Sequence, residues 1–298
     1  MILVTGGTGF VGAHLARRLV REGRQVRLLV RDPGRVAADL RGQVETAPGD
    51  VRDAGSVCAA AQGADTVIHL VGIICESRGA GFEMMHVQAT EHVLAACRDA
   101  GVRRYLHMSA LGTRPNAASR YHRTKWQAEE LVRASGLDWT IFRPSVIVGR
   151  GQDFTHQLLE VMGHAPVIPI IGSGQARLQP IGIDDVTACF RRALDQPQTI
   201  RQTYELGGPK TFTLEEIMDL LARYASLRKS TVYIPVALLR PAAWVIERLF
   251  RNPALTLDQL TMLQEDNICD IGAMKQAFGI EPESFQDLLT AMAKPAAR

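Results

Sequence analysis

The 298-residue sequence lacks a long apolar run, a large net charge and a basic leader at its start. The segment 232–250 comes nearest to a membrane span, but proline, arginine and glutamate interrupt it, so no span is expected. The net charge is only +3, and basic residues are scattered among acidic ones, which predicts no nucleic-acid partner. Because Met1-Ile2-Leu3-Val4 has no basic region, we expect no signal peptide.

Cysteine is also scarce, with five residues in the chain. None belongs to a CxxC pair, and none has the spacing to histidine that a metal site requires, so no metal is expected. Thiols in this pattern are typical of a cytoplasmic protein, in which they stay reduced. They are Cys58, Cys75, Cys97, Cys189 and Cys269.

Short apolar runs alternate with longer segments of helical periodicity in the first two-thirds of the chain. The runs are apolar along their whole length, which indicates burial on both faces in a parallel sheet covered by helices. This order predicts a doubly wound α/β fold with a parallel Rossmann sheet. The expected strands are Ile2–Thr5, Gln25–Val30, Val44–Ala47, Thr66–Leu70, Tyr105–Met108 and Trp139–Arg143. The expected helices include Phe10–Glu22, Phe82–Ala100 and Ser119–Ser135.

The chain is expected to divide at about residue 145. Residues 1–145 form the dinucleotide-binding core, and residues 146–298 form a smaller, mostly helical substrate lobe that is interleaved with the core. Segments near 180–208 are expected to complete the sheet. In the lobe, Thr213 and Glu216 have the spacing of a capping box ahead of an apolar run, which predicts a helix start.

One apolar segment of the lobe contains Trp244, Ile246, Leu249 and Phe250. Such a segment can line an apolar substrate mouth or touch a membrane surface, so a peripheral membrane contact stays open. A buried amphipathic helix is the simpler interpretation and the one we favour, because amphipathic helices mostly face protein cores.

A glycine-rich turn follows the first expected strand and precedes the first expected helix. Its glycines fit GxxGxxG and GxGxxG together, the patterns of dinucleotide-binding turns. Glycine permits the tight turn, the close approach of the pyrophosphate and the close packing of helix on strand, while free N–H groups at the helix start bind phosphate. A dinucleotide is therefore the expected cofactor, and a turn without a ligand is the alternative. The predicted contacts are Thr5, Gly6, Gly7, Thr8, Gly9, Phe10, Val11 and Gly12.

Ligands in doubly wound sheets lie beyond the carboxyl ends of the strands. The residues that follow the expected strands are therefore further candidates for cofactor contacts. Asp50 is a candidate contact to the adenine, with the N-cap of the next helix as its alternative role. The candidates are Asp50, Val51, Leu70, Val71, Gly72, Met108 and Pro144.

The end of the second expected strand bears on the choice between NAD and NADP. An acidic residue there holds a ribose 2′-hydroxyl, whereas an arginine accommodates a 2′-phosphate. Val30 stands where the acid is expected and Arg31 follows it, so we favour NADP(H) over NAD(H). Asp32 is the competing feature, because it has the general spacing of an NAD-binding acid.

Tyr121 and Lys125 form a YxxxK element on an expected helix. Their spacing places both side chains on one helix face. A neighbouring ammonium group favours the phenolate, so Lys125 is expected to lower the pKa of Tyr121 and to contact the cofactor ribose. Tyr121 then exchanges a proton with a substrate oxygen. His122 lies off this face and is expected to be solvated.

Other polar residues have simpler interpretations. His69 and His107 lie on expected buried strands, and core packing is the favoured role for both. Arg143 has two open alternatives, lining the cleft or pairing with an acidic residue.

The glycine loop, Tyr121 and Lys125, Arg143-Pro144 and the segment 179–186 together resemble the short-chain dehydrogenase/reductase superfamily, in its extended and atypical branch. The likeness covers nearly the whole chain. The segments 106–111, 119–125, 141–149 and 257–263 look like those of a subgroup that includes the Rossmann-type accessory subunit of respiratory complex I and sugar-nucleotide epimerase-like proteins.

The resemblance implies a catalytic set of asparagine, serine, tyrosine and lysine. The tyrosine and lysine correspond to Tyr121 and Lys125. The serine corresponds to Ser109, although the next two residues lack the hydroxyl that extended members place there. His86 stands at the asparagine position. Loss of the serine donor would remove stabilisation of a carbonyl oxygen in the transition state.

Three functional hypotheses follow. The favoured one is an oxidoreductase or epimerase-like enzyme that uses NADP(H) on a hydroxyl or carbonyl group of a small or lipid-like substrate. The departures from the catalytic set leave open a non-catalytic nucleotide-binding scaffold or assembly factor for a respiratory complex or a quinone-biosynthesis complex. A redox sensor that binds NADP to regulate a partner is the third. A homodimer is common in the family that the sequence resembles.

Overall fold

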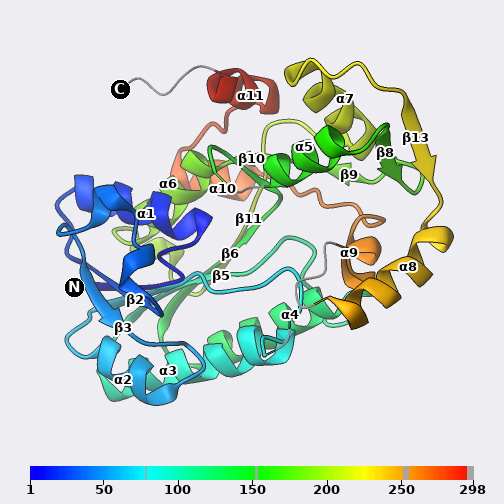
Figure 1. Ribbon diagram of the computed structural model, residues 1–298. Helices are drawn as coiled ribbons and strands as arrows, with labels where there is room; N and C mark the ends of the chain where they lie inside the picture. Colours follow the sequence, from blue (N-terminus) through cyan, green and yellow to red (C-terminus); the bar gives the residue numbers. More distant parts are fainter. Residues whose placement is uncertain (78, 152–153, 251–254, 294–298) are drawn as a thin grey trace.

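The computed structural model describes residues 1–77, 79–151, 154–250 and 255–293. Its centre is a seven-stranded parallel sheet in the order β11-β6-β5-β4-β1-β2-β3 (Figure 1). This order and the helices on both faces confirm the predicted doubly wound Rossmann fold. The strands are β1 (Ile2–Thr5), β2 (Val26–Val30), β3 (Glu45–Pro48), β4 (Thr66–His69), β5 (Arg104–Met108), β6 (Asp138–Pro144) and β11 (Gln202–Leu206).

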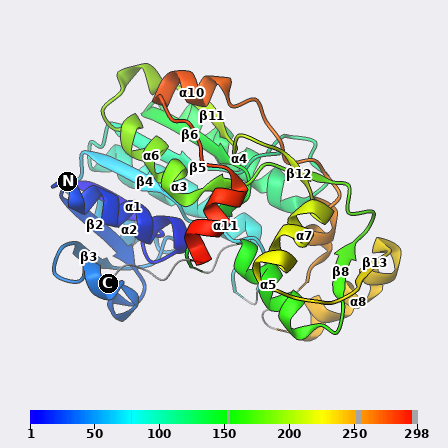
Figure 2. The ribbon, with the colours of Figure 1, turned by 90° about the horizontal axis from the view of Figure 1, so that it is seen from above.

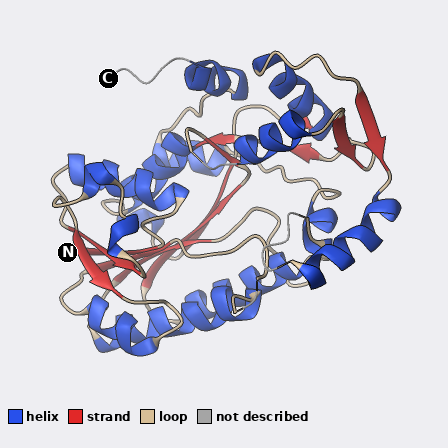
Figure 3. Ribbon diagram, in the orientation of Figure 1, coloured by secondary structure: helices blue, strands red, loops and turns tan. Residues whose placement is uncertain are grey.

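Two helical layers enclose the sheet, as Figure 3 shows. One layer packs around Val4, and the other around Leu3, which belong to two separate apolar clusters. Neighbouring residues of a strand point to opposite faces, so a strand buried on both faces is apolar at most of its positions. The first layer contains α1 (Phe10–Arg21), α6 (Ile183–Ala193) and α10 (Gly272–Phe278), and the second contains α2 (Ala54–Ala61), α3 (Ala89–Asp99) and α4 (Arg120–Ala134).

A stretch of π-helix, η3 (Glu83–Gln88), leads directly into α3. Phe82 precedes it, and His86 lies within it. Short π-helical stretches are rare and are often found at functional sites. Here the stretch packs against α4, the helix that carries Tyr121 and Lys125.

Most of the remaining elements lie at the end of the molecule away from β3, whereas α11 (Phe285–Ala293) lies nearer the middle (Figure 2). They include three two-stranded sheets, β7 with β10, β8 with β13 and β9 with β12. The helices are α5 (Phe154–His164), α7 (Leu214–Tyr224), α8 (Val236–Leu249), α9 (Leu257–Met262) and α11 (Phe285–Ala293). The short strands are β7 (Ile147–Val148), β8 (Ile168–Ile171), β9 (Arg177–Leu178), β10 (Ile181–Gly182), β12 (Phe212–Thr213) and β13 (Thr231–Ile234). The capping box predicted at Thr213 and Glu216 is present at the start of α7.

The expectation that the helix around Trp244 is buried was wrong. In α8 only Ala243 is buried. Trp244 is 48% exposed and Leu249 is 70% exposed, and Phe250 after the helix is 60% exposed. Sequence periodicity identifies an apolar helix face but does not say whether another element covers it. None of the helices in the described ranges has the length and apolar character of a membrane-spanning segment.

Candidate functional site

The predicted cofactor residues come together at one edge of the sheet. Thr5, Met108 and Pro144 end β1, β5 and β6, while Leu70-Val71-Gly72 follows β4 and Asp50-Val51 lies just past β3. Because these strands are parallel, their carboxyl ends share that edge. Ligands of doubly wound sheets bind there.

The glycine loop has no room for side chains at its key positions. A Cβ atom on Gly12 would lie 2.2 Å from the carbonyl oxygen of Gly6, and one on Gly7 would lie 2.7 Å from Leu28. Gly6 has a φ of 76°, which favours glycine. The Gly9 N–H donates to the Gly6 oxygen at 3.0 Å and closes the turn.

The start of α1 faces this turn. Gly9 is the N-cap, and no side chain caps the first N–H groups of the helix. The first turn also has no acidic residue, so the positive end of the helix dipole is not neutralised there. A helix start of this kind fits an anionic diphosphate.

Two charged residues, Arg31 and Asp32, follow β2, and their side chains have different surroundings. Arg31 is exposed, whereas Asp32 accepts a hydrogen bond from the Gly34 N–H at 2.9 Å and caps a short 3-10 turn. Asp50 forms an ion pair with Arg52 at 2.6 Å, which together with nearby Arg31 holds the pKa of Asp50 below its ordinary value.

The alternative role of Asp50 as an N-cap was wrong. Asp53 is the N-cap of α2, and its carboxylate accepts from Gly55 and Ser56. The turn after β3 is three residues longer than expected, which moves the helix start to the second aspartate. Asp50 is therefore left at the strand end, where it faces the edge of the sheet.

Lys125 is buried at the same edge. Its Nζ donates to the carbonyl oxygen of Met108 at 2.9 Å, and the side chain passes close to Gly72. A Cβ atom on Gly72 would lie 2.9 Å from Lys125 Nζ and 3.7 Å from His86 Nε2. Burial lowers the pKa of Lys125 to about 8. The ammonium group, the His86 ring and the backbone after β4 thus converge on one point.

His86 is fully fixed by hydrogen bonds. The Ile73 N–H donates to Nε2 at 3.1 Å, and Nδ1 lies 2.8 Å from the hydroxyl of Thr124. Burial, together with nearby Lys125, lowers the pKa of His86 to about 2, so the ring is neutral at physiological pH. An imidazole held in this way can act as a neutral hydrogen-bonding group, as an asparagine would.

Aromatic rings surround Tyr121. Phe82, His86 and His122 lie edge-on to it, with ring centroids 5.9, 5.4 and 5.2 Å away. Burial raises the pKa of Tyr121 to about 12. This is opposite to the predicted direction, because removal of the phenolate from water disfavours the charged form and no charge offsets that effect.

The hydroxyl groups of Ser109 and Ser119 both have hydrogen-bond partners within the protein. Ser109 is buried, and its hydroxyl donates to Thr113 at 3.4 Å. Ser119 caps α4, and its Oγ lies 3.0 Å from Nδ1 of His122. The prediction of a solvated His122 was wrong, because the ring is 6% exposed and packs over Gly112.

Glu129 of α4 forms a buried ion cluster with Arg133 and Arg143. Glu129 is fully buried and accepts from Arg143 at 2.7 Å and from Arg133 at 2.6 Å. Acid pairing is therefore the role of Arg143 that the structure supports. His69 and His107 are buried in the sheet, as predicted, and their rings stack with centroids 5.6 Å apart.

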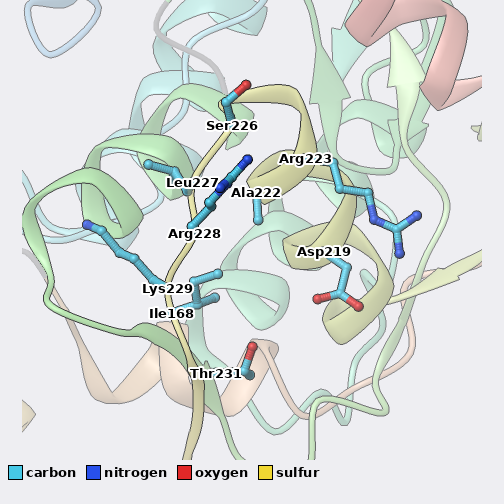
Figure 4. A pocket seen from close by; sticks show the side chains of 9 residues that line it. All are labelled: Ile168, Asp219, Ala222, Arg223, Ser226, Leu227, Arg228, Lys229 and Thr231. Atoms are coloured by element: carbon cyan, nitrogen blue, oxygen red, sulfur yellow. The ribbon is translucent and has the colours of Figure 1, made fainter.

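A cavity of about 490 Å³ is lined by Phe82, the ring that packs against Tyr121. Arg248 and Phe250 also line it. A second cavity of about 420 Å³ is far from the glycine loop and lies between α7 and β13 (Figure 4). Its basic side chains Arg223 and Lys229 point in different directions, so they do not form one anion site.

Three site residues were missed by sequence reasoning. Thr124 holds His86, Phe82 packs against both His86 and Tyr121, and Glu129 balances the two arginines. Thr124 and Glu129 share α4 with Tyr121 and Lys125, and Phe82 lies one helical turn before His86. Their proximity to the motif was the available signal.

Comparison with known proteins agrees with this geometry. A family model described as NAD(P)H-binding matches residues 6–161. The mitochondrial NADH dehydrogenase (ubiquinone) 1 alpha subcomplex subunit 9 of Arabidopsis thaliana is 31% identical over 96% of this chain and 72% of its own length. The ceramide reductase of Caulobacter vibrioides is 33% identical over 63% of this chain and 59% of its own. A crystal structure of UDP-glucuronic acid 4-epimerase from Bacillus cereus has a TM-score of 0.77 at 19% identity, covering 98% of this chain and 97% of its own, and shows the shared fold.

Proposed function

The chain belongs to the NAD(P)H-binding family of atypical short-chain dehydrogenases/reductases, and on that premise we propose that it is an NADP(H)-dependent reductase. Its substrate carries a carbonyl group on a small or lipid-like molecule. The observation that carries the proposal is the convergence of Tyr121, Lys125 and neutral His86 beyond the carboxyl edge of the sheet, next to the glycine loop.

The residues present fit the cofactor. The glycine loop and the uncapped start of α1 would hold the diphosphate, and Lys125 beside Gly72 would hold the nicotinamide ribose. Arg31 would contact the 2′-phosphate. The use of Asp32 in its own turn supports NADP(H), because its carboxylate is then less available to a ribose hydroxyl.

The nicotinamide, when bound, supplies the hydride. Tyr121 acts as the general acid that protonates the substrate oxygen. The phenol is protonated at neutral pH, and burial, which raises its pKa to about 12, disfavours the phenolate that the reverse direction would need. Lys125 supplies the positive charge near the reacting oxygen, and His86 orients the backbone after β4.

The test replaces the phenol and leaves the ring. For Tyr121→Phe we expect reductase turnover on a panel of carbonyl substrates to fall by about 10²-fold or more, the range for removal of a general acid. Affinity for NADPH, measured by calorimetry, should stay unchanged and exceed that for NADH. Tyr233→Phe is the matched control, because that tyrosine is 47% exposed on β13. Full turnover by Tyr121→Phe would refute the proposal.

A second candidate is a non-catalytic nucleotide-binding assembly factor for a respiratory or quinone-biosynthesis complex. The observation that favours it is the hydroxyl of Ser109, which is bound to Thr113, together with the absence of a hydroxyl at Ala110 and Leu111. This candidate predicts NADPH binding without turnover, and full rescue of a deletion strain by Tyr121→Phe. Failure of that variant to rescue, with NADPH affinity intact, would favour the reductase.

A further inference from the structure

An apolar stripe runs along the outer face of α8. Leu238, Val245 and Leu249 are spaced by seven and four residues, so they lie above one another on one side of the helix. They are 69%, 44% and 70% exposed. Helices of globular proteins normally turn such a stripe toward the core. In α8 the small Ala243 is the buried residue instead, and the large side chains face outward.

The stripe continues toward the candidate site. Phe250, directly after the helix, is 60% exposed and lines the cavity of about 490 Å³. Phe82 also lines that cavity and packs against Tyr121. The exposed apolar surface therefore ends at a cavity that is one side chain, Phe82, away from the proposed proton donor. In Figure 1, α8 lies beside α9, at the end of the molecule away from β3.

The basic and acidic side chains near α8 differ in whether they have bonding partners. Arg248 is exposed, forms no ion pair within the described ranges and lies over the ring of Trp244 at 4.2 Å, about 80° around the helix from the stripe. Arg240 is also exposed, but it lies on the side of the helix opposite the stripe. The carboxylates of the nearby acidic residues accept hydrogen bonds from backbone N–H groups. Glu247 accepts from the N–H of Leu257 at 2.6 Å, and Asp258 accepts from the N–H of Arg120 at 2.9 Å. This side of the helix thus combines apolar side chains with a flanking arginine, Arg248, that forms no ion pair among the described residues.

This combination suits the surface of an anionic bilayer. Leucine and phenylalanine enter the boundary of the acyl chains, arginine binds lipid phosphates, and tryptophan is enriched at the level of the headgroups. A second copy of the chain would meet the same cations, so a symmetric contact through this face would bring like charges together.

We propose that α8 docks on an anionic lipid bilayer, with Leu238, Val245, Leu249 and Phe250 in the acyl boundary and Arg248 at the phosphates. Docking in this way places the mouth of the cavity at the lipid surface. A membrane amphiphile then enters the cavity next to Phe82, the ring that packs against Tyr121, without crossing bulk water. This consequence for the substrate rests on the proposed function, whereas the docking itself does not.

The test is sedimentation of the full chain with vesicles, without cofactor or substrate. We expect binding to vesicles of equimolar phosphatidylcholine and phosphatidylglycerol, and much weaker binding to phosphatidylcholine alone. The variant Leu238→Ser/Leu249→Ser should lose about a hundredfold in partition, because each buried leucine contributes about tenfold. Val161→Ser, a comparably exposed position on α5, should bind like the wild type.

Three further measurements keep the result interpretable. NADPH affinity and circular dichroism should be the same in all variants, which shows that they are folded. Vesicles should shift the tryptophan emission of the wild type to shorter wavelength, and Trp244→Phe should remove that shift. The proposal is overturned if the wild type stays in the supernatant, if the double serine variant binds as well as the wild type, or if light scattering shows a dimer that this variant dissociates. Because no turnover is measured, these outcomes are independent of the proposed reductase activity.

Discussion

In the Rossmann core, Leu3 and Leu15 have no exposed surface, whereas on α8 Leu238 and Leu249 are more than two-thirds exposed. The charges show the same contrast. Glu129 of the core is fully buried between two arginines, while the arginines of α8 stand without acidic partners among the described residues. The core therefore uses its apolar and charged groups for stability, and α8 keeps both kinds of group available. Substitutions in the two regions should have effects of different kind and size.

The largest contrast should come from two glycines. In Gly12→Ala the new methyl group would lie 2.2 Å from a backbone oxygen, so we expect NADPH binding to be abolished. A methyl group on Gly163 of α5 would meet no described atom within 4 Å, and Gly163→Ala should retain binding and stabilise the helix by roughly 0.5 kcal/mol or more. Calorimetric titration and thermal unfolding measure both effects. NADPH binding by Gly12→Ala with wild-type affinity would contradict the role of the loop.

The next effect concerns the buried acid. Glu129→Ala leaves two arginines without their buried partner, and should lower the free energy of unfolding by about 3–5 kcal/mol. Glu130 is the matched control, because its side chain is 55% exposed and pairs only with Arg133 among the described residues. Glu130→Ala should cost less than about 1 kcal/mol. Denaturant titration distinguishes them, and equal losses would show that the buried cluster is not special.

The buried lysine should make stability depend on pH. The pKa of Lys125 is about 8 in the folded chain and 10.5 in its ordinary state. The unfolded chain therefore binds more protons between these values, and the free energy of unfolding rises with pH across that window. Lys125→Met should remove roughly 2 kcal/mol of this rise between about pH 8 and 9.5. Lys210→Met, in an exposed turn, should leave the slope unchanged; the same slope in both variants would argue against a buried ammonium.

The smallest effect should come from α8 itself. Leu249→Ala should change the free energy of unfolding by less than about 0.5 kcal/mol, because the side chain is 70% exposed. Leu15→Ala, at a position without exposed surface, should cost about 2–5 kcal/mol. A large loss for Leu249→Ala would mean that the helix face is covered in solution, and would remove the contrast with the core.

The core could be predicted from the sequence because its signals are local. Apolar strands such as Ile2–Thr5, the glycine loop and the capping box at Thr213 depend on neighbours in the chain. Contacts between segments that are distant in the sequence could not be predicted from such local signals. Thr124 supports His86 across 38 residues, and Asp53 rather than Asp50 caps α2 because the preceding turn is longer than expected.

The burial of individual helix side chains was also predicted wrongly at two positions. His122 was expected in solvent and Trp244 in the core, and the structure reverses both. Helical periodicity defines faces of a helix, but only the packing of other elements decides which face is covered. For Tyr121, the position was predicted from the motif, but its pKa depends on the rings of Phe82 and His122 around it.

The π-helical stretch at Glu83–Gln88 has a consequence for how this site can change. Removal of one residue there would let the stretch relax into an ordinary helix, and successive residues of such a helix are rotated by about 100°. His86 would then leave Thr124 and Ile73, while α3 kept its place against the sheet. A single deleted codon could thus exchange the residue presented to Tyr121, with no substitution at the catalytic motif.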